Sequence, residues 1–369
     1  MEIYPLIMKN ICFFLYDLKM GGAEKVIVNL ANYLAKKGYK VSLLTVNDGN
    51  DLEDLINPDV KVETLGKEKI ISSLPRLIYF LRQNHFNYFV PNVWPITIIS
   101  FVTRIISRKT QMVFIEHCDL TAEFNNRNFF FKLFQNISIF IFYRLAHKVI
   151  TVSGGVKDDL LIKGVPRNKL EVIYNPRLSI NNNDPKDPID IEKWVNSPEK
   201  KIICVGELKK QKNFSNLIKA IGILHKKFKV KSSVLILGDG IERDILENLI
   251  EKEDLNDHIF LPGWVKSPIP FLEMADLFVL SSDYEGFGVV IAEALSTGLN
   301  VVSTDCKSGP REILNDGELG TLCEVDNPGD LAEGIYKSLE NPKDKEILLR
   351  RAEDFSMDNI GKQYEKIFT

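Results

Sequence analysis

A chain of 369 residues exceeds what a single hydrophobic core usually serves, so we expect two domains. Hydrophobic residues make up 45% and charged residues 26%, which is typical of a globular protein and excludes a disordered or fibrous chain. The net charge of −3 is unevenly placed, since residues 1–175 hold 22 Lys and Arg against 16 Asp and Glu. That balance is too weakly basic to indicate nucleic acid, but it suits an anionic lipid surface or a diphosphate-linked partner.

The cysteine pattern and the absence of long apolar runs indicate the compartment. The five cysteines are scattered without a C-x-x-C pair, which argues against a disulfide framework or a zinc site and indicates a reducing compartment. The amino-terminal stretch lacks the basic and apolar regions of a signal peptide. No uninterrupted apolar run reaches about 18 residues, so no spanning helix is predicted. We therefore expect a cytoplasmic protein.

The first predicted elements form a strand–helix–strand unit. The apolar run Asn10–Tyr16 leads into Gly21-Gly22, and helical periodicity then extends from Glu24 to Gly38. Val41–Val46 is the next predicted strand, and it should pair in parallel with the first. The glycine turn lies at the carboxyl end of a strand, where open α/β sheets bind ligands. A plain loop glycine pair explains it equally well.

Four further strands are predicted in the first half of the chain. They are Tyr88–Val90, Gln111–Ile115, Lys148–Val152 and Glu171–Ile173. His117 follows the second of them directly. A lone histidine after a strand is more often structural than catalytic, but a place at the carboxyl end of a strand favours a functional role.

The segment Phe124–His147 carries eight Phe or Tyr residues interleaved with cations. These cations are Arg127, Lys132, Arg144 and the adjacent Lys148. One interpretation is a large amphipathic helix packed on the first domain. The other is a peripheral membrane contact through residues 124–148, with the aromatic face in the lipid and the cations toward acidic headgroups. The two interpretations stay open at this point.

A second α/β pattern follows a Pro- and Asn-rich segment. We predict an N-terminal domain at 1–175, a linker at 176–200, a second domain at 201–341, and C-terminal helices at 342–369 that pack back on the first domain. The strands predicted in the second domain are Ile202–Val205, Ser233–Leu237, Ile259–Leu261, Leu277–Leu280 and Val301–Ser303. Helices alternate with them from about Ser215 to Lys227 and from Glu242 to Glu253. This alternation predicts a second parallel sheet covered on both faces.

Two carboxylates mark the stretch after Leu280 as a candidate ligand site. Glu285 and Glu293 are eight positions apart, a rise of about 12 Å if both lie on one helix. Gly286, Phe287 and Gly288 stand between them, and N–H groups at a helix start bind anions. The two carboxylates can accept hydrogen bonds from hydroxyl groups, and the amides between them can bind phosphate. A ligand with hydroxyls at both ends and phosphate in the middle is a nucleotide-sugar. An isolated pair of such acids is usually no more than a solvated helix start.

Several motifs together resemble the retaining GT-B glycosyltransferases of group 1, also called GT4, over nearly the whole chain. The most specific is E-x7-E within EGFGVVIAEAL at Glu285 and Glu293, joined by GGAE at 21–24 and VGELKKQKN at 205–213. LGDG at 237–240, LPGWV at 261–265 and SGPREIL at 308–314 complete the set. The resemblance implies an α/β chain with two Rossmann-like domains whose parallel sheets face an interdomain cleft.

The resemblance also implies roles for individual residues. His117, Glu285 and Lys212 would stand at the reacting centre. Glu285 would hold the ring hydroxyls of the transferred sugar, Glu293 the ribose hydroxyls, and Lys212 the diphosphate charge. The remaining residues expected to contact the donor are Gly22, Gly206, Gly263, Val265, Gly286, Phe287, Gly288, Val289 and Val290. Ser153 matches a family position that has no clear catalytic duty.

One residue departs from the family pattern. Glu207 stands where family members usually carry Arg, so one cation expected near the diphosphate is missing. An acid there repels the donor unless it points away or pairs with Lys209, Lys210 or Arg311. Lys209 or Lys210 is a candidate for the second cation. No D-x-D pair occurs in the matched motifs, so no metal and no cofactor are expected.

The expected reaction transfers a hexose or N-acetylhexosamine from a nucleotide-diphosphate sugar, and a UDP-sugar is the favoured donor. The expected acceptor is a glycan or a lipid-linked saccharide in cell-surface polysaccharide synthesis, which would bring the chain to the inner face of the cytoplasmic membrane. A nucleotide-sugar epimerase of the same fold and a non-catalytic partner subunit are the alternatives. A dinucleotide-dependent oxidoreductase is disfavoured because no G-x-G-x-x-G turn follows a strand.

Overall fold

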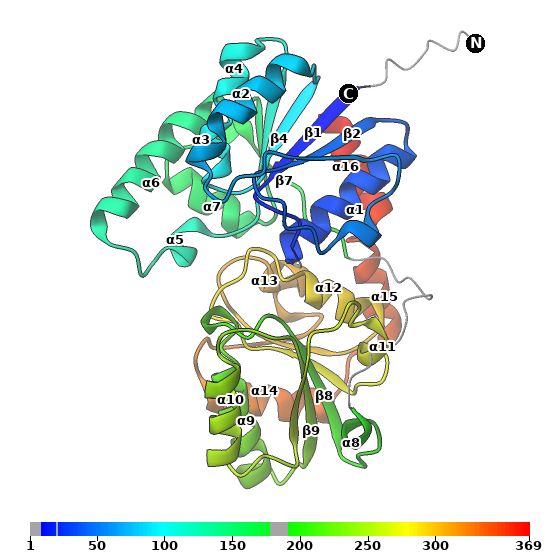
Figure 1. The fold of residues 1–369 in the computed structure, drawn as a ribbon. Coiled ribbons are helices and arrows are strands. Elements are labelled where there is room, and N and C mark those ends of the chain that lie inside the picture. Colours follow the sequence, from blue (N-terminus) through cyan, green and yellow to red (C-terminus); the bar gives the residue numbers. More distant parts are fainter. Residues whose placement is uncertain (1–8, 20, 178–190) are drawn as a thin grey trace, which may run out of the picture. The chain divides into compact units, whose positions relative to one another are not determined.

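The computed structural model describes residues 9–19, 21–177 and 191–369, and within them the chain divides into two compact units. The first unit contains residues 9–177 and 356–369, and the second contains 191–355. Each unit is a parallel sheet with helices on its faces (Figure 1). The chain thus has the two Rossmann-like α/β domains that the alternating pattern predicts. Residues 178–190 of the predicted linker lie outside the described residues.

The first unit is built on a seven-stranded sheet in the order β3-β2-β1-β4-β5-β6-β7. Its strands are β1 (Asn10–Leu15), β2 (Lys40–Thr45), β3 (Lys61–Thr64), β4 (Tyr88–Pro91), β5 (Gln111–Glu116), β6 (Lys148–Thr151) and β7 (Leu170–Val172). Its helices are α1 (Gly22–Lys36), α2 (Leu74–Gln83), α3 (Ile96–Ile99), α4 (Val102–Ile106), α5 (Leu120–Glu123), α6 (Phe129–Phe142), α7 (Gly154–Ile162) and α16 (Met357–Ile367). The strand order reverses between β1 and β4, which is where open sheets of this kind bind ligands.

The second unit repeats this design with a six-stranded sheet in the order β10-β9-β8-β11-β12-β13. Its strands are β8 (Lys200–Val205), β9 (Ser232–Leu237), β10 (Ile259–Gly263), β11 (Leu277–Leu280), β12 (Val301–Thr304) and β13 (Thr321–Cys323). Its helices are α8 (Glu192–Val195), α9 (Phe214–Lys227), α10 (Arg243–Lys252), α11 (Ile269–Leu272), α12 (Val289–Ser296), α13 (Pro310–Ile313), α14 (Pro328–Glu340) and α15 (Lys345–Glu353). The order reverses between β8 and β11.

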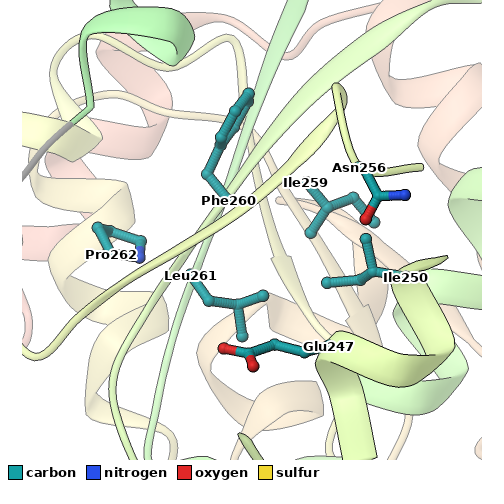
Figure 2. A pocket seen from close by; sticks show the side chains of 7 residues that line it. All are labelled: Glu247, Ile250, Asn256, Ile259, Phe260, Leu261 and Pro262. Atoms are coloured by element: carbon teal, nitrogen blue, oxygen red, sulfur yellow. The ribbon is translucent and has the colours of Figure 1, made fainter. Parts of the chain in front are cut away.

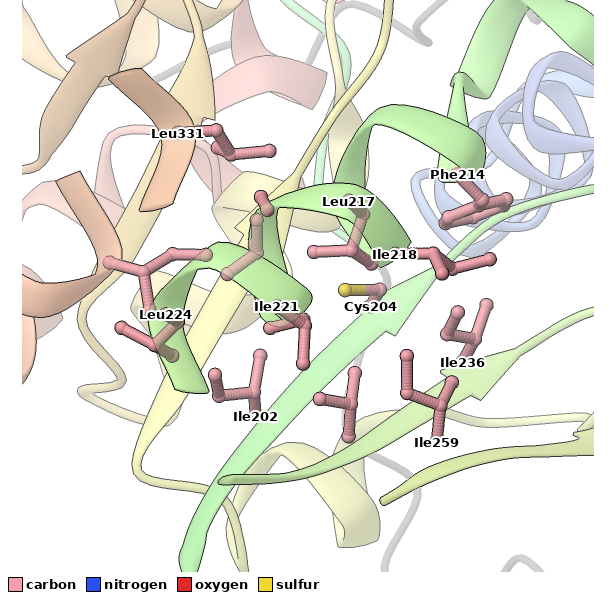
Figure 3. Close-up of a cluster of buried hydrophobic side chains, with 14 of the residues drawn as sticks. Ile202, Cys204, Phe214, Leu217, Ile218, Ile221, Leu224, Ile236, Ile259 and Leu331 are labelled. Atoms are coloured by element: carbon pink, nitrogen blue, oxygen red, sulfur yellow. The ribbon is translucent and has the colours of Figure 1, made fainter. Parts of the chain in front are cut away.

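A dense apolar core fixes the second sheet against its helices. Ile202 and Cys204 of β8 face Leu217 and Ile221 of α9, and all four are fully buried (Figure 3). The side chain of Asn213 caps α9 by accepting a hydrogen bond from the N–H of Asn216 at 3.2 Å. Because this cap begins the helix directly after the β8 loop, the loop between them is short and its side chains have defined positions.

The carboxyl-terminal segment divides between the two units. Residues 342–369 were predicted to pack back on the first domain, and α16 does lie in the first unit. The hydroxyl of Tyr33 on α1 donates to Glu365 Oε1 at 2.6 Å, and Phe368 packs edge-on against Phe13 and Tyr88. In contrast, α15 belongs to the second unit, where it packs on α12.

Two edge strands of the structure, β3 and β13, were not predicted from the sequence. β3 and β13 are short, and β3 is largely exposed, so neither carries the apolar run that identifies a buried strand. The helices predicted at 342–369 are α15 and α16. The predicted aromatic helix 124–147 is α6 followed by a single 3₁₀ turn at Tyr143–Leu145.

Candidate functional site

The predicted donor residues of the second unit follow two adjacent strands. The loop after β8 carries Gly206 and Lys212, and the loop after β11 carries Glu285 and Gly288. β8 and β11 pair directly in parallel, so their carboxyl ends meet at the point where the strand order reverses. Open α/β sheets place ligands in the crevice outside such strand ends. Sheet topology thus brings together two motifs that are about 75 residues apart in sequence.

Lys212 and Glu285 form a largely buried ion pair. The Lys212 ammonium lies 2.6 Å from Glu285 Oε1, and the two side chains are only 15% and 8% exposed. The Ser282 hydroxyl donates to the same carboxylate oxygen at 2.7 Å. The aliphatic part of Lys212 lies across Gly206, where a Cβ would stand 3.2 Å from Lys212 Cε. A side chain at position 206 would therefore push the ammonium away from Glu285.

The start of α12 places backbone N–H groups beside this pair. Gly288 is the N-cap residue with a φ of 89°, a left-handed conformation that glycine adopts without steric cost. Val289 and Val290 form the partly exposed first turn, whose N–H groups have no acceptor within the helix. Phe287 is buried against Phe355 with ring centroids 5.4 Å apart, which anchors the loop. The helix start is therefore fixed in place and suited to an anion.

Glu285 does not lie on the helix that carries Glu293. α12 begins at Val289, so the expectation that both acids lie along one helix is wrong. Gly286 and Gly288 interrupt helical periodicity, and Glu285 is held in the loop by Lys212 and Ser282 instead. Glu293 is a buried residue on the helix itself. The two carboxylates therefore have different supports, one in a loop and one on a helix.

The predicted base-pocket residues lie at the end of β10. Gly263 is the last residue of that strand, and its carbonyl accepts from the N–H of Gly238 at 2.8 Å. The Val265 side chain is buried, whereas Trp264 is 42% exposed. If these residues contact a base, the Val265 side chain therefore supports the pocket from within, and the exposed contact comes from Trp264 and the backbone.

The concave sites found in the separate units lie away from the predicted residues. A pocket of about 320 Å³ is lined by Glu247 and Ile250 of α10, by Asn256 and by Ile259–Pro262 (Figure 2). A second one, of about 590 Å³, lies in the first unit at the amino ends of β1 and β2. Neither contains a predicted site residue. The candidate site is therefore assigned from the strand ends and not from these two pockets.

In the first unit, Gly22 and His117 both follow strands of one sheet. Gly22 opens α1 after β1, and His117 follows β5 directly. Both ring nitrogens of His117 are buried, and neither has a hydrogen-bond partner among the described residues. Burial lowers the pKa of His117 to about 4, so the ring is neutral at neutral pH. A buried imidazole with both nitrogens unsatisfied is unusual in a purely structural role.

Glu116 is the residue of this site that the sequence analysis missed. It is completely buried, and its carboxylate accepts from the Tyr143 hydroxyl at 2.6 Å and from the N–H groups of Trp94 and His117 at 3.3 and 3.2 Å. Burial raises the pKa of Glu116 to about 7, against the effect of these hydrogen bonds. The sequence signal that could have identified Glu116 is its position as a charged residue at the end of an otherwise apolar strand. Glu116 holds the backbone at His117 in place.

Three further predicted residues have clear local partners. Glu207 pairs with Lys209 at 2.9 Å, one of the three pairings open to it. Arg311 instead pairs with Asp305. Ser153 caps α7 by accepting from the N–H of Val156 at 3.2 Å, a structural duty. The Glu207 charge is thus compensated, and so is that of Lys209.

Among the described residues, no group of three or more His, Cys, Asp or Glu has an arrangement that could hold a metal ion. Across 9–19, 21–177 and 191–369, no helix combines the length and apolar character needed to cross a membrane. The five cysteines are free thiols.

The fold and the strand-end residues define a glycosyltransferase of the GT-B class. The family model described as glycosyl transferases group 1 matches residues 186–355, and that described as glycosyltransferase family 4 matches residues 20–177. The chain belongs to this family of group 1 glycosyltransferases, as its motifs indicate.

Two curated relatives and one solved structure are similar over much of the chain. An N-acetylgalactosamine-N,N'-diacetylbacillosaminyl-diphospho-undecaprenol 4-alpha-N-acetylgalactosaminyltransferase of Campylobacter jejuni is 29% identical, covering 98% of this chain and 97% of its own. The lipopolysaccharide 1,6-galactosyltransferase of Escherichia coli is 28% identical over 50% of this chain and 49% of its own. The structure of Anabaena HepE in complex with UDP has a TM-score of 0.77 at 19% identity, covering 97% of this chain and 99% of its own.

Proposed function

We propose that the chain transfers a hexose or N-acetylhexosamine from a nucleotide-diphosphate sugar to a lipid-linked saccharide, with retention of the anomeric configuration and without a metal ion. The observation that carries the proposal is the Lys212–Glu285 ion pair beside the start of α12. A UDP-sugar is the preferred donor, because the structurally similar Anabaena HepE was solved in complex with UDP. A lipid-linked acceptor is preferred because the Campylobacter relative is named for an undecaprenol-linked one.

In this proposal Lys212 and α12 stabilise the leaving group. As the bond between the anomeric carbon and the phosphate oxygen breaks, its electron pair stays on the departing diphosphate. The Lys212 ammonium and the N–H groups of the first turn of α12 stabilise that negative charge. Lys212 is already oriented by Glu285 before donor binds, so little reorganisation is needed.

The acids are proposed to position the donor rather than to attack it. Glu285 accepts hydroxyls of the moving sugar with its remaining lone pairs, since Lys212 and Ser282 share one oxygen, Oε1. Glu293 accepts the ribose hydroxyls. The acceptor oxygen bonds to the anomeric carbon on the face that the phosphate leaves, and its proton passes to the departing phosphate. His117, neutral and with unsatisfied ring nitrogens, is proposed to hydrogen-bond at the reacting centre.

The remaining predicted contacts complete the proposed donor site. Gly22 offers its backbone to the phosphates, and Gly206 leaves room for Lys212. Gly263 and Val265 support the base. A location in the cytoplasm, at the inner face of its membrane, fits the five free cysteines and a lipid-linked acceptor.

A donor panel tests the proposal. Nucleoside diphosphate release from UDP- and GDP-sugars is measured with and without lipid extract, using Glu285→Ala as the control. We expect release from one donor, stimulated by extract and abolished in the variant. An altered free nucleotide-sugar without acceptor transfer would indicate the epimerase instead. No turnover of any donor under either condition would indicate the non-catalytic partner subunit.

A further inference from the structure

Helix α6 of the first unit exposes an unusually apolar face. Phe129 and Phe130 are 71% and 79% exposed. At 100° per residue, the exposed large apolar side chains fall on one arc of about 140°. They are Phe129, Phe130, Leu133, Phe134, Ile137, Phe140 and Ile141. No charged residue of the helix falls within that arc.

The face turned into the unit is, by contrast, partly polar. Gln135 and Ser138 are buried there, and the Ser138 hydroxyl accepts from the indole N–H of Trp94 at 3.0 Å. The Ser138 hydroxyl also donates to the backbone carbonyl of Gln135 at 2.7 Å, so this face of α6 is tied into the fold through Ser138. Figure 1 shows α6 at the outer edge of its unit. A continuous aromatic surface of this kind on a folded domain marks an interaction site.

The charge around this face is strongly positive. Between residues 101 and 169, Lys and Arg outnumber Asp and Glu by 11 to 5, and three of the acids, Glu116, Asp119 and Asp159, are buried. Arg144 packs 3.6 Å over the Phe140 ring and Arg127 packs over Phe131, so cations flank both ends of the helix. Apolar surface rimmed by cations complements an anionic lipid surface.

The same charges disfavour a second copy of the chain as the occupant. Joining two copies through this face would bring Arg127, Lys132 and Arg144 of one copy close to the same cations of the other. A membrane removes this conflict, because anionic headgroups surround the cations while the phenyl rings enter the acyl boundary.

We propose that α6 lies in the interface of an anionic lipid bilayer, with the arc from Phe129 to Ile141 inserted and Arg127, Lys132 and Arg144 at headgroup level. This deepens the proposed function by stating how the chain reaches a lipid-linked acceptor, and it rests on that function only for the identity of the acceptor. The end of α7 extends the face, since Lys163 on its C-cap donates to Asn136 of α6 and the neighbouring Ile162 is 81% exposed.

Vesicle flotation of the purified full chain tests the proposal. Vesicles of phosphatidylcholine alone are compared with vesicles that also contain phosphatidylglycerol. We expect flotation with the anionic vesicles, weakened by salt, and at least a roughly tenfold loss in the variant Phe130→Ser/Phe134→Ser/Ile137→Ser. The matched control is Ile71→Ser/Tyr79→Ser, which changes exposed apolar residues elsewhere on the same unit and should float like wild type. Arg127→Gln/Lys132→Gln should lose the preference for anionic vesicles.

A fluorescence measurement tests the same proposal without requiring the triple variant to fold. Phe130→Trp should show a blue-shifted emission when anionic vesicles are added, beyond any change in wild type. Wild type that stays free of vesicles, or a control that loses flotation equally, overturns the proposal. A wild-type dimer in sedimentation that the triple variant disperses would assign the face to a second copy instead.

Donor turnover in the absence of lipid separates this proposal from the proposed function. Nucleoside diphosphate release in solution should be the same in wild type and in the triple variant, because the three substituted side chains are exposed on α6 and none of them is a proposed donor or catalytic residue. Vesicle binding without any donor turnover would retain the membrane face and reject the transferase. Donor turnover without vesicle binding would retain the transferase and reject the membrane face.

Discussion

The Lys212 ammonium and the Glu285 carboxylate lie 2.6 Å apart at the ends of neighbouring strands, although 73 residues separate them in sequence. Neither charge is well solvated, so each depends on the other for stability. Removing one partner of a buried pair leaves an uncompensated charge and costs about 3–5 kcal/mol at full burial. This dependence makes the pair testable as a unit.

Lys212→Met should lower the free energy of unfolding by about 2–4 kcal/mol, because Glu285 would remain buried without its cation. The double variant Lys212→Met/Glu285→Gln should recover most of that loss, since no charge remains unpaired. Neither variant should release nucleoside diphosphate. Chemical denaturation of Lys212→Met, Glu285→Gln and the double variant measures the coupling between the two residues. Additive losses would show that the pair is not coupled in solution.

Glu293→Gln should weaken donor binding by about tenfold to a hundredfold. The charged carboxylate acceptor is replaced by a neutral amide, which forms a weaker hydrogen bond. Titration calorimetry with the preferred donor measures this. Glu247→Gln, an acid on α10 of the same unit, is the matched control and should leave affinity unchanged. Equal affinity in Glu293→Gln and wild type would remove Glu293 from the donor site.

His117→Asn should reduce kcat about a hundredfold while the donor KM stays close to wild type, since the proposed contact forms at the reacting centre. His85→Asn, in the same unit but at the amino ends of the strands, serves as control. Because the pKa of His117 is about 4, its protonation should not limit the rate between pH 5.5 and 8.5. A rate that falls below pH 6.5 in wild type but not in His117→Asn would contradict this.

Glu116 should make the stability of the chain fall as pH rises. Its folded pKa is about 7 against an ordinary value of 4.5, so the native state holds a proton that the unfolded state has lost across that window. The stabilisation is full below pH 4.5 and is lost through pH 7, by about 3 kcal/mol. Glu116→Gln lacks this dependence. The unfolding free energies of the two proteins are measured from pH 5 to 8. That of wild type should fall relative to that of Glu116→Gln as the pH rises.

The Glu207–Lys209 pair predicts unequal effects of two neighbouring cations. Lys209 is already compensated by Glu207 at 2.9 Å, so Lys209→Glu should weaken donor binding less than Lys210→Glu. Glu207→Arg, which restores the family residue, should tighten donor binding by about tenfold, since a charge-assisted contact contributes about 1.5 kcal/mol or more. Unchanged affinity in all three variants would show that the diphosphate lies away from this loop.

The sequence by itself determined the family, the alternating architecture and the residues at the strand ends. These are local features: an apolar strand, a glycine turn and a helix start are encoded within about ten residues, and their periodicity survives without neighbours. Glu285, Glu293 and His117 were predicted from such local patterns, and Lys212 from the resemblance of its motif to the family. β3 and β13 were not, because a short edge strand depends on its partner rather than on its own pattern.

Only the tertiary structure decided which of these residues meet. Strand order brings the β8 loop beside the β11 loop, and no periodicity encodes that order. It also decided that Glu285 lies in a loop while Glu293 lies on α12, that Glu116 supports His117, and that α6 turns its polar residues inward. Burial and pairing are non-local properties, because each depends on chain segments that the sequence places far apart.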